Sequence, residues 1–283
     1  MLSRRSFIKQ TGLLSFVALA NPLSLQAANS SIGVQLYTLR ADIAKDAVGT
    51  ISKVAALGYK EVESFGYKEG KYFDMTPAEF STFLKSKGLS HPSSHYSLAG
   101  IENNPQKVID DAITAGQQFI IVASIPGDSR KTADDYKKIA ARFNKVGELC
   151  KKDGIRFGYH NHDFEFKDLD GQVGYDILLA ETDPLLVAFE LDIYWASFAG
   201  KDPVTMFSQH PGRFELWHVK DMVTEPKKTF TEVGSGVIDF KKIYAAAKKS
   251  GMKHFFVEQD ICPGPPLDSI EKSFRYIQKN LVK

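Results

Sequence analysis

From Ile32 onward the sequence repeats one pattern eight times: an amphipathic helical stretch, usually a glycine, a short apolar stretch and a polar loop. The apolar stretches predict eight β-strands, at residues 32–36, 61–65, 89–95, 119–123, 155–160, 187–191, 214–219 and 254–258. Eight β-α units in about 250 residues predict a closed (β/α)₈ TIM barrel of the α/β class, with a single domain. An open doubly wound sheet is the alternative, but no G-x-G-x-x-G motif follows the first strand.

The helical stretches carry their own start signals. Thr76, Pro77 and Glu79 form a capping box with proline at the first helical position. Asn104 and Asp202 each stand before a proline and predict two further helix starts. The last helix is predicted at residues 267–281.

The amino terminus has the features of an export signal. Residues 3–9 read S-R-R-S-F-I-K, a twin-arginine signature, and a short apolar run at 13–20 and a small-residue cleavage site at 25–28 follow it. We therefore expect residues 1–28 to be a twin-arginine signal peptide and residues 29–283 to be the barrel domain of a periplasmic protein. An anchor helix is the alternative, but the apolar run is too short to span a bilayer. Since this route exports folded proteins, a metal ion could be loaded before export.

Charge and cysteine content narrow the expected partners. The chain has a net charge of +2, and loss of its first 28 residues would leave −1. This near-neutral balance predicts neither a nucleic-acid partner nor an anionic membrane surface. Cys150 and Cys262 are expected to be thiols rather than a disulfide, although a periplasmic location would permit one.

Polar residues collect where the predicted strands end, which is where a barrel of this kind forms its active site. Strands five to eight each supply a carboxylate or an imidazole, in G-Y-H-N-H-D-F-E-F at 158–166, E-L-D-I-Y-W at 190–195, W-H-V-K-D at 217–221 and V-E-Q-D at 257–260. Carboxylates gathered this closely would repel one another without a counter-ion. The mixed oxygen and nitrogen set therefore predicts one divalent metal ion, Mn²⁺, Co²⁺, Zn²⁺ or Mg²⁺.

Several stretches resemble the xylose-isomerase-like TIM barrels, the sugar phosphate isomerases/epimerases: G-Y-K-E-V-E at 58–63, L-D at 191–192, H-V-K-D at 218–221, G-S-G-V-I-D-F at 234–240 and V-E-Q-D at 257–260. The resemblance covers nearly all of residues 32–283. It implies a metal ion held by Asp192, His218 and Glu258. The strand-five ligand is His160 in one form of the family and Glu165 in the H-x-H form, which is similar to inosose dehydratase; Glu165 is the favoured of the two.

With Glu165 as the ligand, His160 and His162 would share the inward face of strand five, because side chains alternate along a strand. Either histidine is then a candidate acid or base, and the alternative is a hydrogen-bonded core histidine. Lys220 would neutralise a developing oxyanion or donate a proton, unless it is a solvated surface lysine.

Four more residues are expected to contact substrate. Gln35 and His95 would bond to sugar hydroxyls across the barrel mouth, Trp195 would stack on a sugar face, and Gln259 stands beside Glu258. The loop at 234–236 follows strand seven, where many barrels bind phosphate. A tight turn ahead of the helix that Asp239 opens is its favoured role.

The reaction implied by the resemblance is removal of a proton next to the carbonyl of a sugar, with a metal-stabilised enediolate as the intermediate. Reprotonation would make the protein an isomerase or epimerase. Loss of a β-substituent would make it a lyase or dehydratase of a keto-sugar such as a 3-keto-glycoside, as in related exported lyases.

A sugar-binding protein without turnover is the remaining alternative. A DNA-repair endonuclease is disfavoured by the charge, and a glycosidase by the histidine that ends strand seven. The expected partner is a small sugar or keto-sugar, with no membrane span. The oligomeric state is left open, a homodimer included.

Overall fold

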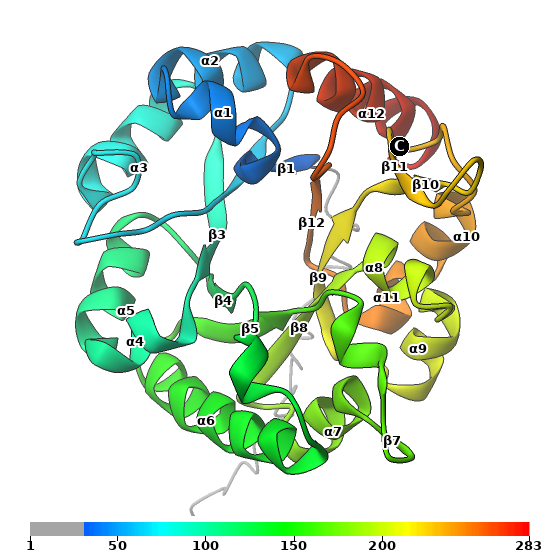
Figure 1. Cartoon of the computed structure of the whole chain (residues 1–283). Coiled ribbons are helices and arrows are strands. Elements are labelled where there is room, and N and C mark those ends of the chain that lie inside the picture. Colours follow the sequence, from blue (N-terminus) through cyan, green and yellow to red (C-terminus); the bar gives the residue numbers. More distant parts are fainter. Residues whose placement is uncertain (1–30, 283) are drawn as a thin grey trace, which may run out of the picture.

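The structure, a computed structural model, describes residues 31–282, which form one closed barrel of parallel strands (Figure 1). The TIM-barrel prediction is confirmed, and each of the eight predicted strands is found to within one residue at either end. The barrel strands are β1 (Gly33–Gln35), β2 (Glu61–Ser64), β3 (Ser90–Tyr96), β4 (Phe119–Val122), β5 (Arg156–His160), β8 (Val187–Asp192), β9 (Phe214–Val219) and β12 (His254–Val257). β1 closes the ring by pairing with both β2 and β12. The predicted signal peptide lies outside the described residues.

Helices surround the barrel on its outer face (Figure 1). They are α1 (Arg40–Ile43), α2 (Ala47–Leu57), α3 (Pro77–Ser86), α4 (Leu98–Asn103), α5 (Pro105–Thr114), α6 (Ala133–Lys152), α7 (Gly174–Glu181), α8 (Ile193–Phe198), α9 (Pro203–Gln209), α10 (Phe240–Ala245), α11 (Ala247–Ser250) and α12 (Pro266–Asn280), with 3₁₀ turns η1 (Leu36–Leu39), η2 (Gly127–Ser129) and η3 (Phe164–Phe166). The capping box of Thr76 and Glu79 is formed at the start of α3, and Asn104 and Asp202 cap α5 and α9 as predicted. Gly58 ends α2 with φ at +108°, a conformation that favours glycine.

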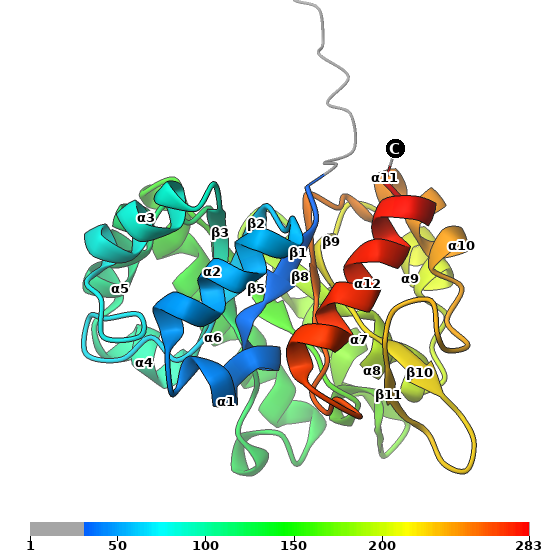
Figure 2. The ribbon, with the colours of Figure 1, turned by 90° about the horizontal axis from the view of Figure 1, so that it is seen from above.

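Two small hairpins were not predicted. One joins β6 (Asp168–Leu169) to β7 (Gln172–Val173), and the other joins β10 (Asp221–Val223) to β11 (Thr229–Thr231). Figure 2 shows the β10–β11 hairpin at the same end of the barrel as α1, which follows β1. This end is therefore the rim where the carboxyl ends of the strands meet.

Part of the barrel interior is apolar. Its side chains form a cluster of their own, made of Phe119, Ile121, Ala188, Leu216 and Phe256. Two glycines make room for it, because a Cβ on Gly33 would lie 2.5 Å from the Phe256 ring and one on Gly158 would lie 2.7 Å from Ile121. Polar side chains are not confined to the carboxyl-end rim, since Glu61 and His254 begin β2 and β12 and lie 2.8 Å apart.

Two further predictions can be compared with residues 31–282. Both Cys150 and Cys262 are free thiols; Cys150 is buried and Cys262 is half-buried. Within these residues no helix combines the length and the apolar character needed to cross a membrane.

Candidate active site

Four predicted or alternative ligand residues meet at the rim: His160 from β5, Asp192 from β8, His218 from β9 and Glu258 after β12. One ligand atom from each lies within 4.8 Å of the others, and all four residues are buried. His160 Nε2 is 3.2 Å from Asp192 Oδ2, and His218 Nδ1 is 2.9 Å from Glu258 Oε2. We call these four residues the rim group. Two imidazoles and two carboxylates suit a first-row divalent ion.

The ring of His160 is oriented for ligation. Its Nδ1–H donates to the carbonyl of Ala123 at 3.2 Å, which leaves Nε2 directed at Asp192. Burial and the neighbouring imidazoles of His218 and His95 hold the pKa of His160 well below its usual range. The residue is therefore a neutral imidazole at neutral pH, the form that binds metals.

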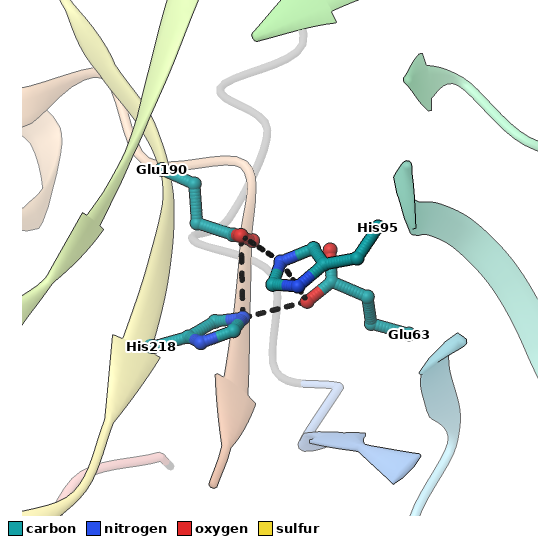
Figure 3. A group of neighbouring side chains, drawn as sticks. All are labelled: Glu63, His95, Glu190 and His218. Atoms are coloured by element: carbon teal, nitrogen blue, oxygen red, sulfur yellow. Dashed lines mark hydrogen bonds and ion pairs between the residues drawn. The ribbon is translucent and has the colours of Figure 1, made fainter. Parts of the chain in front are cut away.

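A second group lies beside the rim group and shares His218 with it. Figure 3 shows Glu63 from β2, His95 from β3 and Glu190 from β8 converging on the His218 ring. His218 Nε2 is 2.6 Å from Glu63 Oε2 and 3.3 Å from Glu190 Oε2, and His95 Nε2 is 2.7 Å from Glu190 Oε2. We call Glu63, His95 and Glu190 the inner layer.

Charge explains why the inner layer tolerates burial. Burial opposes a charge on His218, but Glu190, Glu258 and Glu63 outweigh it and raise the pKa of this imidazole well above its usual range. Burial likewise opposes the charge on His95, whose pKa is raised by Glu63 and Glu190. The carboxylates are thus balanced by two positively charged imidazoles.

Lys220 follows β9, and its ammonium group lies among carboxylates rather than in solvent. It is 2.8 Å from Asp192 Oδ2 and 2.8 Å from Asp260 Oδ2, and it also donates to Glu258. Burial alone would lower the pKa of Lys220, but Asp192, Asp260 and Glu258 raise it well above its usual range. The expected alternative of a solvated surface lysine therefore does not describe this residue.

A pocket of about 420 Å³ opens above these groups. Such a volume is in the range of small-molecule sites. None of the described residues that line it is a lysine or arginine. They are Tyr37, Phe65, Gly66, His95, Tyr96, Ser97, Ala123, Ser124, His160, His162, Glu258 and Asp260.

His162 reaches this pocket from the chain after β5. Its Nδ1 is buried and has no hydrogen-bond partner in the described part of the protein. Burial and the nearby His160 lower the pKa of His162 to about 3, so that the ring is neutral. The ring stacks on Phe164 at a centroid distance of 5.3 Å. His162 therefore lines the pocket as a neutral ring, and its Nδ1 has no partner among the described side chains.

Glu165, the favoured strand-five ligand, belongs to neither group of candidate ligand atoms. It lies in η3, where its carboxylate accepts hydrogen bonds from the Tyr159 hydroxyl and, at 2.9 Å, from the His162 backbone N–H. His160, the alternative ligand, is the strand-five residue that lies with Asp192, His218 and Glu258. The physical reason is the turn after β5, which directs Glu165 back toward β5.

The predicted substrate contacts divide into two kinds. His95 lines the pocket, as expected. Gln35 is fully buried and donates to Glu63 Oε2 at 2.8 Å, and Gln259 is also buried, with its side-chain amide donating to the Ile261 carbonyl. Trp195 lies next to His162, with ring centroids 5.9 Å apart, but is not among the residues that line the pocket. The structure thus brings His95, but not Gln35 or Gln259, to the pocket.

Sequence reasoning did not assign roles to Glu63, Glu190 and Asp260. The signal for Glu190 and Asp260 was present in the alternation of strand side chains, because each lies two positions from a predicted ligand. Glu63 ends a predicted strand, but nothing local marks it as a partner of His218, which is 155 residues away.

The loop at 234–236 forms a turn around an internal carboxylate. Asp221 accepts hydrogen bonds from the backbone N–H groups of Met222, Gly234, Gly236 and Ile238, at 2.8 to 3.0 Å. These amides are therefore already bonded to a buried anion. The arrangement agrees with the favoured structural role of the loop.

Comparisons with known proteins agree with this geometry. Residues 51–280 match the family described as xylose isomerase-like TIM barrel. An inosose dehydratase from Geobacillus thermodenitrificans is 26% identical over an alignment of 236 positions that covers 69% of this chain and 78% of that protein. The solved structure of a sugar phosphate isomerase/epimerase from Parabacteroides distasonis is 28% identical, with a TM-score of 0.80 over 93% of this chain and 99% of that one. The IOLI protein, solved with a zinc atom, is 13% identical, with a TM-score of 0.65 over 88% of this chain and 96% of that one, and shows the shared fold.

Proposed function

Because the chain belongs to the xylose isomerase-like TIM barrel family, which includes metal-dependent sugar isomerases, epimerases and dehydratases, we propose that it is a divalent-metal-dependent sugar isomerase or epimerase. Its reaction would move a proton on the carbon next to the carbonyl of a sugar or keto-sugar. The observation that supports this most is the convergence of the rim group below a pocket that also contains His162.

The rim group fits a divalent ion. His160 Nε2, Asp192 Oδ2, His218 Nδ1 and Glu258 Oε2 would hold it, since these atoms are mutually close and the other nitrogen of each ring is already engaged. His218 would release the proton on Nδ1 when the ion binds. When bound, the ion would supply Lewis-acid polarisation of a sugar carbonyl and neutralise charge that develops on its oxygen. Glu165 is not in this set, and we propose His160 in its place.

Three side chains around the rim group have separate roles in the proposed proton transfer. His162, which lines the pocket and is neutral, is the candidate base for the carbon acid. Lys220, whose ammonium group bonds to Asp192, Glu258 and Asp260, would neutralise charge that develops on oxygen beside the rim group. His95, which is charged and lines the pocket, would donate to a sugar hydroxyl.

Solvent exchange tests this function. The purified protein with Mn²⁺ is incubated with keto-sugars in D₂O, and deuterium at the carbon next to the carbonyl is followed by NMR. Wild-type protein is expected to promote exchange, and His162→Ala to reduce it by about 10²-fold or more. Phe164→Leu, which changes the ring stacked on His162, is the matched control and should keep most of the exchange. Absence of exchange with every keto-sugar, with and without metal, would overturn the proposal.

Elimination is the second candidate. The similarity to an inosose dehydratase and the presence of a neutral His162 and a charged His95 in one pocket support it, because β-elimination needs a base at carbon and a donor at the leaving oxygen. With a 3-keto-glycoside, release of the alcohol would indicate elimination, and recovery of a deuterated glycoside would indicate epimerisation.

We also propose that residues 1–28 direct export through the twin-arginine route, on the strength of the S-R-R-S-F-I-K stretch alone. Fractionation of cells that produce the full chain would test this. The wild-type protein is expected in the periplasm, and the double variant Arg4→Lys, Arg5→Lys is expected in the cytoplasm. Equal cytoplasmic amounts of the wild type and the variant would contradict export.

A further inference from the structure

A second hollow adjoins the active-site pocket at the same rim. It has a volume of about 710 Å³ and is lined by residues that follow β1 and β2. It shares Phe65 and Gly66 with the pocket. We call it the outer groove. Its lining residues are Arg40, Ile43, Ala44, Lys45, Asp46, Ala47, Val48, Phe65, Gly66, Lys68, Glu69, Lys71, Phe73 and Asp74.

Phe65 and Gly66 form the boundary between the pocket and the groove, because they line both. Gly66 has φ at +72°, and a Cβ placed on it would meet no atom within 4 Å. A ligand that extends from the rim group into the groove would pass these two residues.

The wall beside this boundary is fixed to the active site. The Tyr37 ring meets Phe65 edge-on, with centroids 5.3 Å apart, and the Arg40 guanidinium lies 4.4 Å from the centre of the Tyr37 ring. Arg40 also donates to the Asp260 carbonyl at 2.8 Å. Since Asp260 follows the candidate ligand Glu258 by two residues, the groove wall and the rim group are held in one arrangement.

The chemistry of the groove suits a sugar ring. Phe65 and Phe73 form an aromatic pair, with centroids 5.3 Å apart, that offers an apolar surface. Around it stand side chains of both charge signs: Arg40, Lys45, Lys68 and Lys71 with Asp46, Glu69 and Asp74. Hydroxyl groups bond to both cationic and carboxylate side chains. A ring with an apolar face and many hydroxyls matches this mixture.

We propose that the outer groove binds a second sugar ring, so that the natural substrate is a disaccharide-like molecule whose reacting ring lies over the rim group. This inference rests on the proposed function for the identity of the reacting ring. The groove then acts as a specificity subsite, and a free monosaccharide would fill only the inner pocket.

Binding without turnover tests the subsite. Calorimetry on the Mn²⁺-treated protein compares cellobiose with glucose, two aldoses that carry no ketone, and NMR of the titrated samples checks that neither is converted. Cellobiose is expected to bind about tenfold more tightly than glucose. Val48, which is 51% exposed in the first turn of α2 and lines the groove, is replaced in Val48→Trp to fill the space. This variant should lose the preference for cellobiose.

The matched control is Leu185→Trp. Leu185 is 68% exposed just before β8, at the opposite end of the barrel, and lines neither hollow. It should keep the wild-type preference. Equal affinities for the two sugars, no binding of either, or a preference that survives Val48→Trp would each overturn the subsite. A third ligand, 4-nitrophenyl glucoside, has an aromatic ring in place of the second sugar. If it binds more tightly than cellobiose and Val48→Trp weakens its binding, the groove does not prefer a sugar ring and the sugar assignment is overturned. If Val48→Trp weakens cellobiose binding but the wild-type protein exchanges no proton with any keto-sugar, the subsite is supported and the proposed function is contradicted.

Discussion

Nε2 of His218 lies 2.6 Å from Oε2 of Glu63, so that a carboxylate from β2 holds one nitrogen of an imidazole from β9. This contact directs Nδ1 toward Glu258, at 2.9 Å. Carboxylates that accept the second N–H of a ligating histidine commonly change metal affinity by 10–100-fold when they are replaced.

Glu63→Gln is therefore expected to weaken Mn²⁺ binding by about 10–100-fold, because a neutral amide holds the imidazole less firmly. The dissociation constant from calorimetric titration measures this. Glu148→Gln, on the exposed face of α6, is the control and should bind Mn²⁺ as the wild type does. Unchanged affinity in Glu63→Gln would show that Glu63 does not orient the ligand.

Removal of a metal ion from the rim group should lower the thermal stability of the protein. An ion that binds only the folded state at 100 times its dissociation constant adds about 2.7 kcal/mol to the free energy of unfolding. Wild-type protein is thus expected to show a higher Tm with Mn²⁺ than with EDTA. Asp192→Asn should abolish most of that difference, because it replaces one of the two carboxylate ligands with a neutral amide. The same Tm shift in wild type and variant would argue against this site.

Lys220 balances the carboxylates of Asp192, Glu258 and Asp260 in the buried site. Loss of one partner from a buried ionic group costs about 3–5 kcal/mol. Lys220→Met is expected to lower the free energy of unfolding by about this amount in EDTA, and by less with Mn²⁺, since the ion offsets the same negative charge. Urea unfolding under both conditions measures it, and an equal loss in both would contradict the shared role.

Stability should depend on pH through Glu165. Burial raises the pKa of Glu165 from 4.5 to about 7, although hydrogen bonds from Tyr159 and His162 oppose the shift. Between these values the folded state binds more protons than the unfolded state. The contribution of Glu165 is therefore complete below about pH 4.5 and is lost as pH rises through about 7, by about 3 kcal/mol in total.

Glu165→Gln removes this dependence. Its free energy of unfolding relative to wild type should rise from pH 5 to pH 8, when both are measured in urea at closely spaced pH values. Glu148→Gln should show no such trend. A relative stability that stays flat across this interval would mean that Glu165 is not protonated in the folded protein.

Asp221 organises the loop before α10 through four backbone amides. Asp221→Asn is expected to cost about 1–3 kcal/mol, because an amide cannot accept all these bonds equally well. Faster hydrogen exchange at Gly234 and Gly236 would accompany the lower Tm. Asp128→Asn, at a 95% exposed carboxylate, should change neither quantity.

The barrel could be predicted from the sequence because each β-α unit carries local signals. The capping box at Thr76 and the apolar run at 119–122 mark their elements without reference to the rest of the chain. The β10–β11 hairpin was missed because its strands, three residues each, are too short to show a clear alternation.

The site was predictable only where strand geometry fixes direction. The family resemblance implies Asp192, His218 and Glu258 as ligands; all three lie at predicted strand ends, and the structure brings them together. The positions of Glu165 and Gln35 depend on contacts outside their own strands. Glu165 lies in a 3₁₀ turn and not in the rim group, and the side-chain amide of Gln35 donates to Glu63. Such contacts are not encoded in any single stretch.

The ring of His218, shared between the rim group and the inner layer, means that the eight β-α units of this barrel are not interchangeable modules. A chimera that takes its β1–β2 portion from another barrel would bring a different residue to the position of Glu63, and β9 would lose the carboxylate that orients its histidine. Exchange between such barrels must therefore move β2 and β9 together, although 155 residues separate the two partners.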